Sequence, residues 1–377
     1  MIQSPGILLT VLAFALVIGP LVFLHELGHY LAGRLFGVKA EEFSIGFGRE
    51  IAGITDRRGT RWKFSLLPLG GYVRFAGDMN PASQPSPEWL QLPASERAKT
   101  FQAKPLWQRA IIVAAGPIMN FVVAIVILSG FAMAFGELVT PPVVRAVEPG
   151  TAAAAAGLKA GDRIVALGGR QVGDFDDIYR YIVLRPGASV RIDFVRGGEA
   201  GTLDAVIGTS TLRDRFGNVT QRGMLGIRPG TYELRKISIW EAPLVGLGRT
   251  WQIVGTTVDG LGQIFLGRVS VKELGGPLKI AQVSGQSLAM GPLDLVGLIA
   301  LVSINLGFIN LLPVPVLDGG HLLFYAVEAV RRRPVEPQVM EWAFRGGMLA
   351  ILALMLFVTL NDLGAFGVWR HLAGLIG

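Results

Sequence analysis

Apolar side chains gather in four long runs separated by polar and charged stretches. The first covers residues 7–24 and continues to about residue 35, with no charge before His25. The others cover residues 110–135, 293–312 and 348–360, the last extended by apolar flanks. An α-helix needs about 20 apolar residues to cross a bilayer. We therefore expect a polytopic α-helical membrane protein with four transmembrane helices.

Between the second and third runs the pattern changes to that of a compact soluble domain. Short segments rich in strand formers alternate with turn residues, and residues 175–184 have helical spacing. The pattern predicts an inserted α+β domain over residues 137–232. Its expected strands cover residues 143–147, 163–167, 189–195 and 201–207.

Between the first and second runs the period is that of β-strands. Apolar residues alternate with smaller or polar ones from residue 42, and a turn follows at residues 56–59. The pattern predicts a β-hairpin over residues 42–75. Its second strand should be broken by Pro68, Gly70 and Gly71. Residues 80–99, rich in Pro, Ser and charge, should form a loose connection.

A stretch punctuated by glycine precedes the third run and has amphipathic character, so we expect a connector lying on the membrane surface. The expected boundaries are 1–36 for the first transmembrane helix, 37–107 for the hairpin region and its loop, 108–136 for the second helix, 137–232 for the α+β domain, 233–290 for the connector, 291–333 for the third helix, and 334–377 for the fourth helix and C-terminus.

The charge of the chain is a signal of membrane topology. The formal net charge is +7, and basic residues cluster beside the apolar runs, in residues 34–109 and 331–333. Loops rich in Lys and Arg stay in the cytoplasm, so both termini and the α+β domain should lie on the outer side. The basic residues form no stripe with interleaved aromatics, so nucleic acid is not an expected partner. The first run lacks a preceding basic segment and should be a retained span, not a signal peptide.

A metal-binding pentapeptide, His25-Glu26-Leu27-Gly28-His29, lies inside the first apolar run. Two histidines four residues apart share one face of a helix, as ligands of a tetrahedral zinc ion do. Glu26 is placed to take a proton from the attacking water. Titratable side chains at membrane depth are costly and usually functional. The chain has no cysteine, which excludes thiolate ligands and disulfides. We expect one Zn²⁺ per chain.

A catalytic zinc ion needs a third protein ligand, and Asp318 is the strongest candidate. A carboxylate at membrane depth favours a nearby cation, although an Asp before two glycines also suits a helix cap. His321, three residues further on, is the rival ligand. Pro313 and Pro315 break the third span just before Asp318. Such a break is tolerable only where the freed backbone lines a cavity.

Asparagines in the spans have two interpretations. Asn305 and Asn310 either hold substrate backbone or orient ligands, or they form interhelical hydrogen bonds, and the sequence favours neither. For Asn120, in the second span, the structural role is the better fit.

Taken together, these features resemble the site-2 protease family of intramembrane zinc metalloproteases, and most closely its bacterial regulator of sigma-E protease branch. The likeness rests on the pentapeptide in a first span, the Leu-Asp-Gly sequence at 317–319, and a soluble domain between the second and third spans. Further matching segments are residues 68–73, 115–120, 274–277 and 361–362. The likeness covers nearly the whole chain.

The inserted domain resembles a PDZ domain. The marker is Gly-Leu-Lys-Ala-Gly-Asp-Arg-Ile at residues 157–164, a turn that leads into a strand. The sequence after the helix resembles the carboxylate-binding loop of the permuted bacterial form, at Met224, Leu225, Gly226 and Ile227. The best-known relatives carry two tandem PDZ domains, whereas this chain has room for one, so gating by a tandem pair is in doubt here.

The resemblance implies that His25, His29 and Asp318 ligate zinc and that Glu26 is the general base. It also implies that residues 43–75 form a re-entrant β element beside the active site. An exposed strand edge there would replace the hydrogen bonds of an unwound substrate helix. Glycines would permit the close approach of two backbones, at Gly46, Gly48, Gly70 and Gly71.

The implied activity is hydrolysis of a peptide bond inside the transmembrane segment of a single-pass protein, in the inner membrane of a bacterium, after a first cut on the outer side. The family role is regulated intramembrane proteolysis, typically of an anti-sigma factor in an envelope stress response. Removal of leftover signal peptides is a second implied role. The PDZ domain would filter substrates by size or bind the new C-terminus. Two other classes stay open, a catalytically silent membrane PDZ scaffold and a zinc transporter.

Overall fold

The computed structural model describes residues 6–77, 92–213, 219–231, 233–271 and 275–365. Most of the expected loose connection, residues 80–99, and residue 274 of the matched segment 274–277 lie outside these ranges. The chain divides into two compact units. One comprises residues 1–128 and 276–359, and the other comprises residues 129–275 and 360–377.

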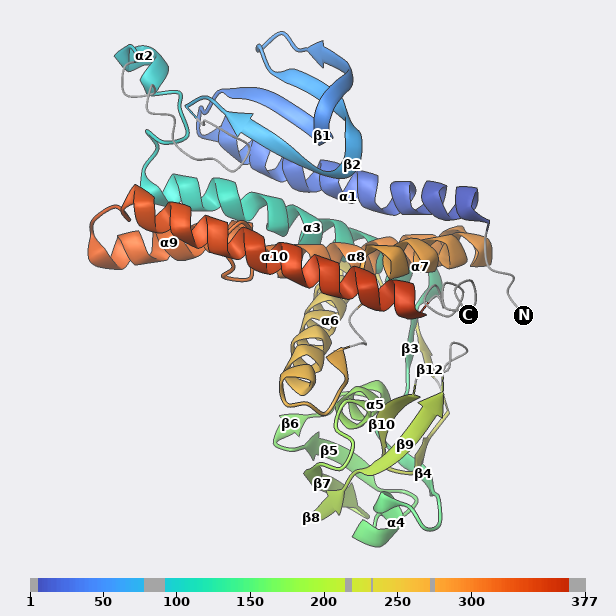
Figure 1. Cartoon of the computed structure of the whole chain (residues 1–377). Coiled ribbons are helices and arrows are strands. Elements are labelled where there is room, and N and C mark those ends of the chain that lie inside the picture. Colours follow the sequence, from blue (N-terminus) through green and yellow to red (C-terminus); the bar gives the residue numbers. More distant parts are fainter. Residues whose placement is uncertain (1–5, 78–91, 214–218, 232, 272–274, 366–377) are drawn as a thin grey trace, which may run out of the picture. The chain divides into compact units, whose positions relative to one another are not determined.

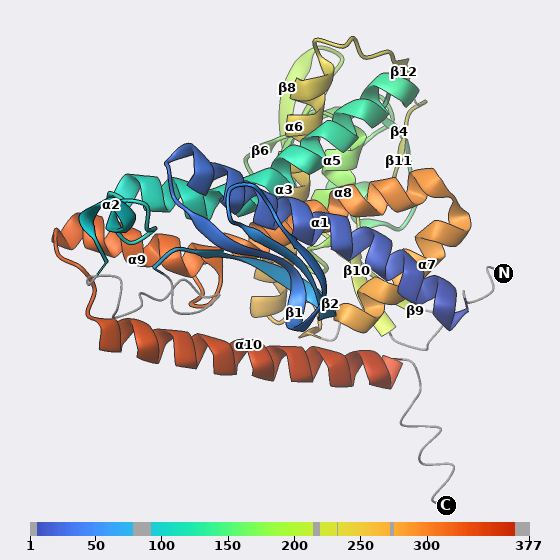
Figure 2. The same cartoon turned by 90° about the horizontal axis from the view of Figure 1, so that it is seen from above.

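The first unit is built mainly from helices (Figures 1 and 2). They are α1 (Ile7–Leu35), α2 (Ala94–Arg97), α3 (Leu106–Phe135), α7 (Pro277–Met290), α8 (Pro292–Asn310), α9 (Asp318–Arg331) and α10 (Pro337–Ala365). Four segments of the described residues are long and apolar enough to cross a membrane, namely α1, α3, α8 and Gln338–Gly364 within α10. They coincide with the four predicted runs, and the chain has the architecture of a multi-pass membrane protein.

The surface of α10 is apolar around much of its circumference. Its exposed side chains include the consecutive residues Leu354, Met355, Leu356 and Phe357, which point to different sides of a helix. Soluble monomers rarely expose contiguous apolar surface on this scale. Lipid chains are the natural neighbour of this surface.

The third predicted span is interrupted where its prolines indicated. Helix α8 ends at Asn310, and α9 begins at Asp318. Between them Val316 has a φ of +89°, which is rare for a β-branched residue. The first turn of α9 lies directly against this loop, because a Cβ on Gly319 or Gly320 would meet the loop backbone. The loop therefore fixes where Asp318 emerges.

Strands β1 (Ala40–Thr55) and β2 (Arg61–Phe75) form the predicted hairpin, which lies along one side of α1 (Figures 1 and 2). The expected interruption of the second strand is wrong in detail, since β2 is continuous and the irregularity appears in its register. Ile45 of β1 is paired both with Gly71 and with Phe64. The hairpin is thus strongly curled, and residues 42–45, near the start of β1, have partners on both sides. Bulges and glycines permit such curvature.

The second unit contains the expected α+β domain. Its elements are β3 (Glu137–Val139), β4 (Val144–Val147), α4 (Ala152–Ala156), β5 (Arg163–Leu167), β6 (Arg170–Gln171), α5 (Phe175–Val183), β7 (Ser189–Arg196), β8 (Glu199–Val206), β9 (Gly208–Arg213), β10 (Val219–Met224), β11 (Ile227–Pro229), β12 (Glu233–Arg235) and α6 (Ala242–Phe265). The main sheet has the order β6-β5-β7-β8. Fully buried Ile164 and Ile192 and nearly buried Ile178 lie in one core. The four strands and the helix read from the sequence are all present.

Helix α6 is the main surprise of the second unit. The sequence indicated a mixed connector punctuated by glycine, yet 24 residues are helical. Packing explains the difference, because polar contacts hold α6 against the α+β domain. Asp259 of α6 accepts two hydrogen bonds from Arg170, and Gln252 donates to Asp177. Such tertiary contacts override the low helix propensity of glycine.

Candidate metal centre

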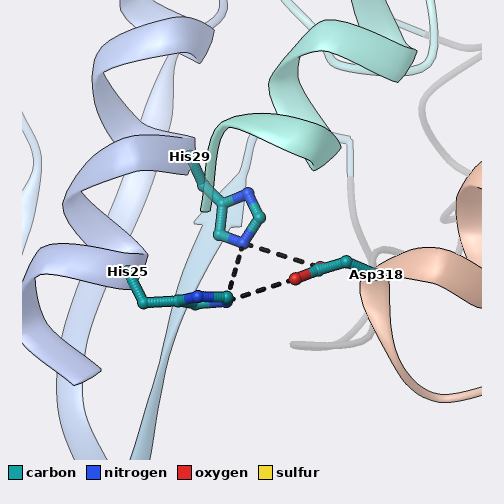
Figure 3. A group of neighbouring side chains, drawn as sticks. All are labelled: His25, His29 and Asp318. Carbon is teal, nitrogen blue, oxygen red and sulfur yellow. Dashed lines mark hydrogen bonds and ion pairs between the residues drawn. The ribbon is translucent and has the colours of Figure 1, made fainter. Parts of the chain in front are cut away.

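Helix α1 carries the two histidines of the pentapeptide on one face, one turn apart. The side chains of His25 and His29 are about nine-tenths buried, and their ring centroids lie 4.9 Å apart. Both rings point toward the first residue of α9, Asp318 (Figure 3). Two segments from opposite ends of the sequence thus meet at this point.

The three side chains direct their ligating atoms at one another. Nε2 of His25 lies 3.2 Å from Oδ2 of Asp318, and Nε2 of His29 lies 3.5 Å from Oδ1. The two Nε2 atoms are 3.3 Å apart. In the part of the chain that the structure describes, this is the one group of three or more His and acidic residues whose ligand atoms lie within 4.8 Å of one another.

This spacing fits a tetrahedral zinc ion. Bonds of about 2.0–2.1 Å in a tetrahedron place neighbouring ligand atoms about 3.3–3.4 Å apart. The measured separations of 3.2, 3.3 and 3.5 Å bracket that value. Two imidazoles and one carboxylate also form the donor set of a catalytic site, since three protein ligands leave a fourth position open.

The tautomer of His29 is set by helix α3. Its Nδ1 donates to the backbone carbonyl of Ile112 at 2.9 Å, and this bond leaves Nε2 with a free lone pair. The ring lies directly against Gly116, where any Cβ would meet it. Gly28 on α1 in turn lies against the carbonyl of Ala115. Small residues on both helices therefore bring α1 and α3 close enough for this contact.

Glu26 is buried on α1 and lies beside the hairpin. A Cβ on Gly71 of β2 would be 2.9 Å from Cγ of Glu26 and 2.7 Å from the carbonyl oxygen of Ser44. The glycine therefore lets the strand pass over the glutamate. The edge of β2 and the carboxyl side chain of Glu26 therefore lie close together, next to the histidines in the sequence of α1.

The other predicted residues of the hairpin differ in their surroundings. Gly46, Gly48 and Gly70 all have positive φ, a conformation that favours glycine. A Cβ on Gly46 would meet the carbonyl of Leu67 at 2.8 Å, whereas Gly48 faces open space. Gly46 is therefore needed for packing within the hairpin, and Gly48 for its backbone conformation alone.

The polar residues near the break in the third span are not part of the three-residue group. Asn305 is half-buried and donates to the carbonyl of Leu301 on its own helix. Asn310 is the last residue of α8. His321, the rival ligand, packs its ring against Tyr325 and Phe344. The geometry favours Asp318 over His321 as the third member.

The predicted peptide-binding loop of the second unit is held by backbone hydrogen bonds. The carbonyl of Leu225 accepts from the amide of Ala153, and that of Gly226 accepts from Glu148. Leu225 is buried, Met224 is exposed, and Ile227 opens β11. The loop is thus anchored both to the first turn of α4 and to the segment ahead of it.

Sequence reasoning missed how the histidines are oriented. The acceptor for His29 is a backbone carbonyl, which every residue offers, so no sequence signal marks Ile112. Asn120 was assigned a structural role, yet its amide lies 3.1 Å from Nδ1 of His25. The spacing along the chain could have indicated this contact, since Asn120 follows Gly116 by one helical turn.

Comparison with known proteins agrees with this chemistry. The model of peptidase family M50 matches residues 13–354. A protein of Agrobacterium fabrum named as a candidate zinc metalloprotease is 44% identical over 94% of this chain and 96% of its own length. Metalloprotease MmpA of Caulobacter vibrioides is 38% identical over 98% of this chain and 99% of its own length.

Among solved structures, the PDZ domain of the SdrC-like protein of Listeria monocytogenes is 25% identical, covers 23% of this chain and 84% of its own length, and has a TM-score of 0.18.

The family match extends over the segments that carry the histidines and the aspartate. It therefore favours an enzyme and not a scaffold or a transporter. The chain belongs to peptidase family M50, the site-2 protease type, and is a zinc metalloprotease.

Proposed function

We propose that this protein hydrolyses a peptide bond within the transmembrane segment of single-pass membrane proteins, with zinc held by His25, His29 and Asp318 and with Glu26 as general base. One observation carries the proposal. Three side chains with the spacing of a tetrahedral site are buried among helices of membrane-spanning length. A hydrolytic centre so located has membrane-embedded peptide bonds as its nearest substrates.

The residues of the chain divide the chemistry among them. When bound, zinc acts as a Lewis acid that polarises the scissile carbonyl and makes water more acidic. Glu26 takes one proton from the attacking water as its oxygen bonds to the carbonyl carbon. The same carboxyl then gives the proton to the amine nitrogen as the C–N bond breaks. The products are a carboxylic acid and an amine, and transfer of the remaining proton between them gives a carboxylate and an ammonium group.

The edge of β2 is the proposed docking strand for the substrate. In the described residues Gly71, Tyr72, Val73 and Arg74 pair with β1 only, so one side of this segment is free of strand partners. A substrate helix must unwind before hydrolysis, and strand addition replaces its lost hydrogen bonds. Gly71 lies against Glu26, so a strand added here runs past the general base. Asn305 and Asn310 are proposed to hold the other side of the substrate backbone.

The β-rich domain of the second unit is proposed to be a single PDZ domain on the periplasmic side of a bacterial inner membrane, with both termini on that side. Its loop at 224–227 suits a free carboxylate, such as the new C-terminus left by a first cut. Under this proposal the substrates are trimmed single-pass proteins such as anti-sigma factors in an envelope stress response, and leftover signal peptides are a second group.

Cleavage of a tagged single-pass protein by the purified enzyme in detergent with zinc tests the proposal. The cleavage site is mapped by mass spectrometry. We expect a cut inside the apolar segment, lost by at least about 100-fold in Glu26→Gln while zinc content is kept. Asp318→Asn should weaken zinc binding, because one ligand loses its charge.

Two variants with the same chemical changes serve as controls. Asp294→Asn changes an aspartate in the first turn of α8, and Glu341→Gln changes an exposed glutamate of α10. Both should cleave at the wild-type rate. Unchanged cleavage by Glu26→Gln would refute the assigned base. A cut only outside the apolar segment would refute intramembrane hydrolysis.

A further inference from the structure

Asn120 is a fully buried polar residue on α3 whose side chain contacts one of the histidines. Nδ2 of its carboxamide lies 3.1 Å from Nδ1 of His25, and its own backbone carbonyl accepts from Ser303 of α8 at 2.8 Å. Its Oδ1 has no hydrogen-bond partner among the described residues. A buried amide in an apolar helix is costly, so a specific function for this side chain is expected.

The chemistry of His25 decides the direction of this contact. Nε2 of His25 faces Asp318 and His29, so a metal ligated by His25 takes the lone pair of Nε2. The proton of the neutral imidazole is then on Nδ1, which must donate. Only the oxygen of the carboxamide can accept that proton. The two ends of a carboxamide occupy nearly the same volume, and turning Oδ1 toward His25 breaks no other bond of that oxygen.

We propose that Asn120 is a positioning residue for the zinc ligand His25, with Oδ1 accepting a hydrogen bond from Nδ1–H. The inference rests on the ligand role proposed for His25. It gives the second span a task in the metal centre besides packing, since the bond fixes both the tautomer and the rotation of the imidazole ring.

The spacing along α3 extends the argument to both histidines. Ile112, Gly116 and Asn120 are each four residues apart and so lie on one face of the helix. Ile112 accepts from His29, Gly116 gives room to the His29 ring, and Asn120 contacts His25. One stripe of α3 therefore orients both imidazoles that α1 supplies.

Zinc affinity of the full-length protein in detergent, measured by competition with a chelator, tests the proposal. Asn120→Leu keeps the volume but has no acceptor, and Asn120→Ala removes the acceptor without adding bulk. Both should weaken zinc binding by about 10- to 100-fold, the usual effect of losing such a partner. Asn120→Asp keeps an acceptor and should stay within about threefold of the wild type. Visible absorption of the Co²⁺-substituted protein should change in the Leu and Ala variants and stay close to wild type in the Asp variant.

Ser303→Ala is the matched control. It removes a hydrogen bond to the same residue but not to the histidine, so zinc affinity should not change. Wild-type affinity in Asn120→Leu, or equal weakening in Asn120→Asp and Asn120→Leu, would overturn the positioning role. His25→Ala separates this failure from that of the proposed function. If His25→Ala binds zinc as the wild type does, the ligand set itself is wrong. If it loses zinc while Asn120→Leu retains it, only the role of Asn120 is wrong.

Discussion

At the scale of single residues, the candidate metal centre depends on the absence of a side chain at Gly116 as much as on the proposed ligands. The His29 ring occupies the space that a side chain at this position would need. A histidine ligand works only in one rotation, because its lone pair must point at the metal. A glycine in a helix of membrane-spanning length thus makes room for the ring of a proposed zinc ligand.

Gly116→Ala should therefore lower zinc affinity by at least about tenfold, with a parallel loss of cleavage, because the added methyl group displaces the His29 ring. Zinc content after dialysis against a weak chelator measures the effect. Gly130→Ala is the control on the same helix, since a Cβ there meets nothing within 4 Å. Equal zinc content in all three proteins would show that the ring has room to move.

Asp162, in the glycine-rich marker of the α+β domain, is a second residue with a specific role. Its side chain is fully buried and accepts hydrogen bonds from the Arg196 guanidinium and from the backbone amide of Lys159. Burial alone would raise the pKa of this carboxyl, but these bonds hold the pKa below the ordinary value of 3.8. The charged form therefore stabilises the folded domain.

Because the folded pKa lies below the unfolded one, this stabilisation is complete well above pH 4 and is lost as the pH falls from there toward the folded pKa. Asp162→Asn should destabilise the domain by about 1–3 kcal/mol at pH 7. The difference in unfolding free energy between the variant and the wild type should be smaller at pH 3.5. The amide exchange rates of β5 and β7 in the intact protein, expressed as the ratio of variant to wild type, measure this difference. If the difference in stability did not depend on pH, the charge of Asp162 would not be the source of the stabilisation.

At the scale of elements, the loop between α8 and α9 determines the position of Asp318, the third proposed ligand. Two prolines end α8, and glycines at the start of α9 allow the chain to fold back closely. Val316 in this loop has a φ of +89°, which costs of the order of 1–3 kcal/mol for a residue that is not glycine. The surrounding packing holds it there, next to Asp318.

Val316→Gly should leave thermal stability unchanged or slightly raised, because relief of backbone strain offsets the lost side-chain contacts. Val314→Gly, in the same loop but without positive φ, should be destabilising by about 1 kcal/mol or more. Thermal unfolding of both variants in detergent provides the comparison. A larger loss for Val316→Gly than for Val314→Gly would show that side-chain packing, and not φ, dominates at this position.

At the scale of the whole molecule, the basic loops predict the orientation in the membrane. The chain has no cysteine, so single introduced cysteines report on topology without background. Glu199 lies exposed in the α+β domain, and Arg58 and Arg333 lie exposed in the basic loops.

A membrane-impermeant maleimide should label Glu199→Cys in cells whose outer membrane is permeable to it. It should label Arg58→Cys and Arg333→Cys only after the inner membrane is opened, because loops rich in Lys and Arg remain cytoplasmic. The cysteine-free wild type is the blank. If Arg58→Cys were labelled while the inner membrane is still closed, the orientation of the chain would be the opposite of the one proposed.

Much of this architecture is readable from the sequence, because membrane helices need long apolar runs and the strands of the α+β domain have clear boundaries. The group of His25, His29 and Asp318 was also foreseen, since HExxH and an intramembrane carboxylate are rare patterns. The curl of the hairpin was not, because double pairing of Ile45 depends on contacts between distant residues. Helix α6 was not predicted either, because its glycines disfavour a helix and its contacts with the domain are visible only in the structure.

The distance along the chain between the proposed ligands has a consequence for biosynthesis. His25 and His29 leave the ribosome early, while Asp318 follows after the second span and the whole α+β domain. A nascent chain therefore carries two histidines but no third ligand and no loop to hold one. With this ligand set the metal centre is incomplete until Asp318 has been made, so proteolytic activity is expected only when insertion of the chain is nearly complete.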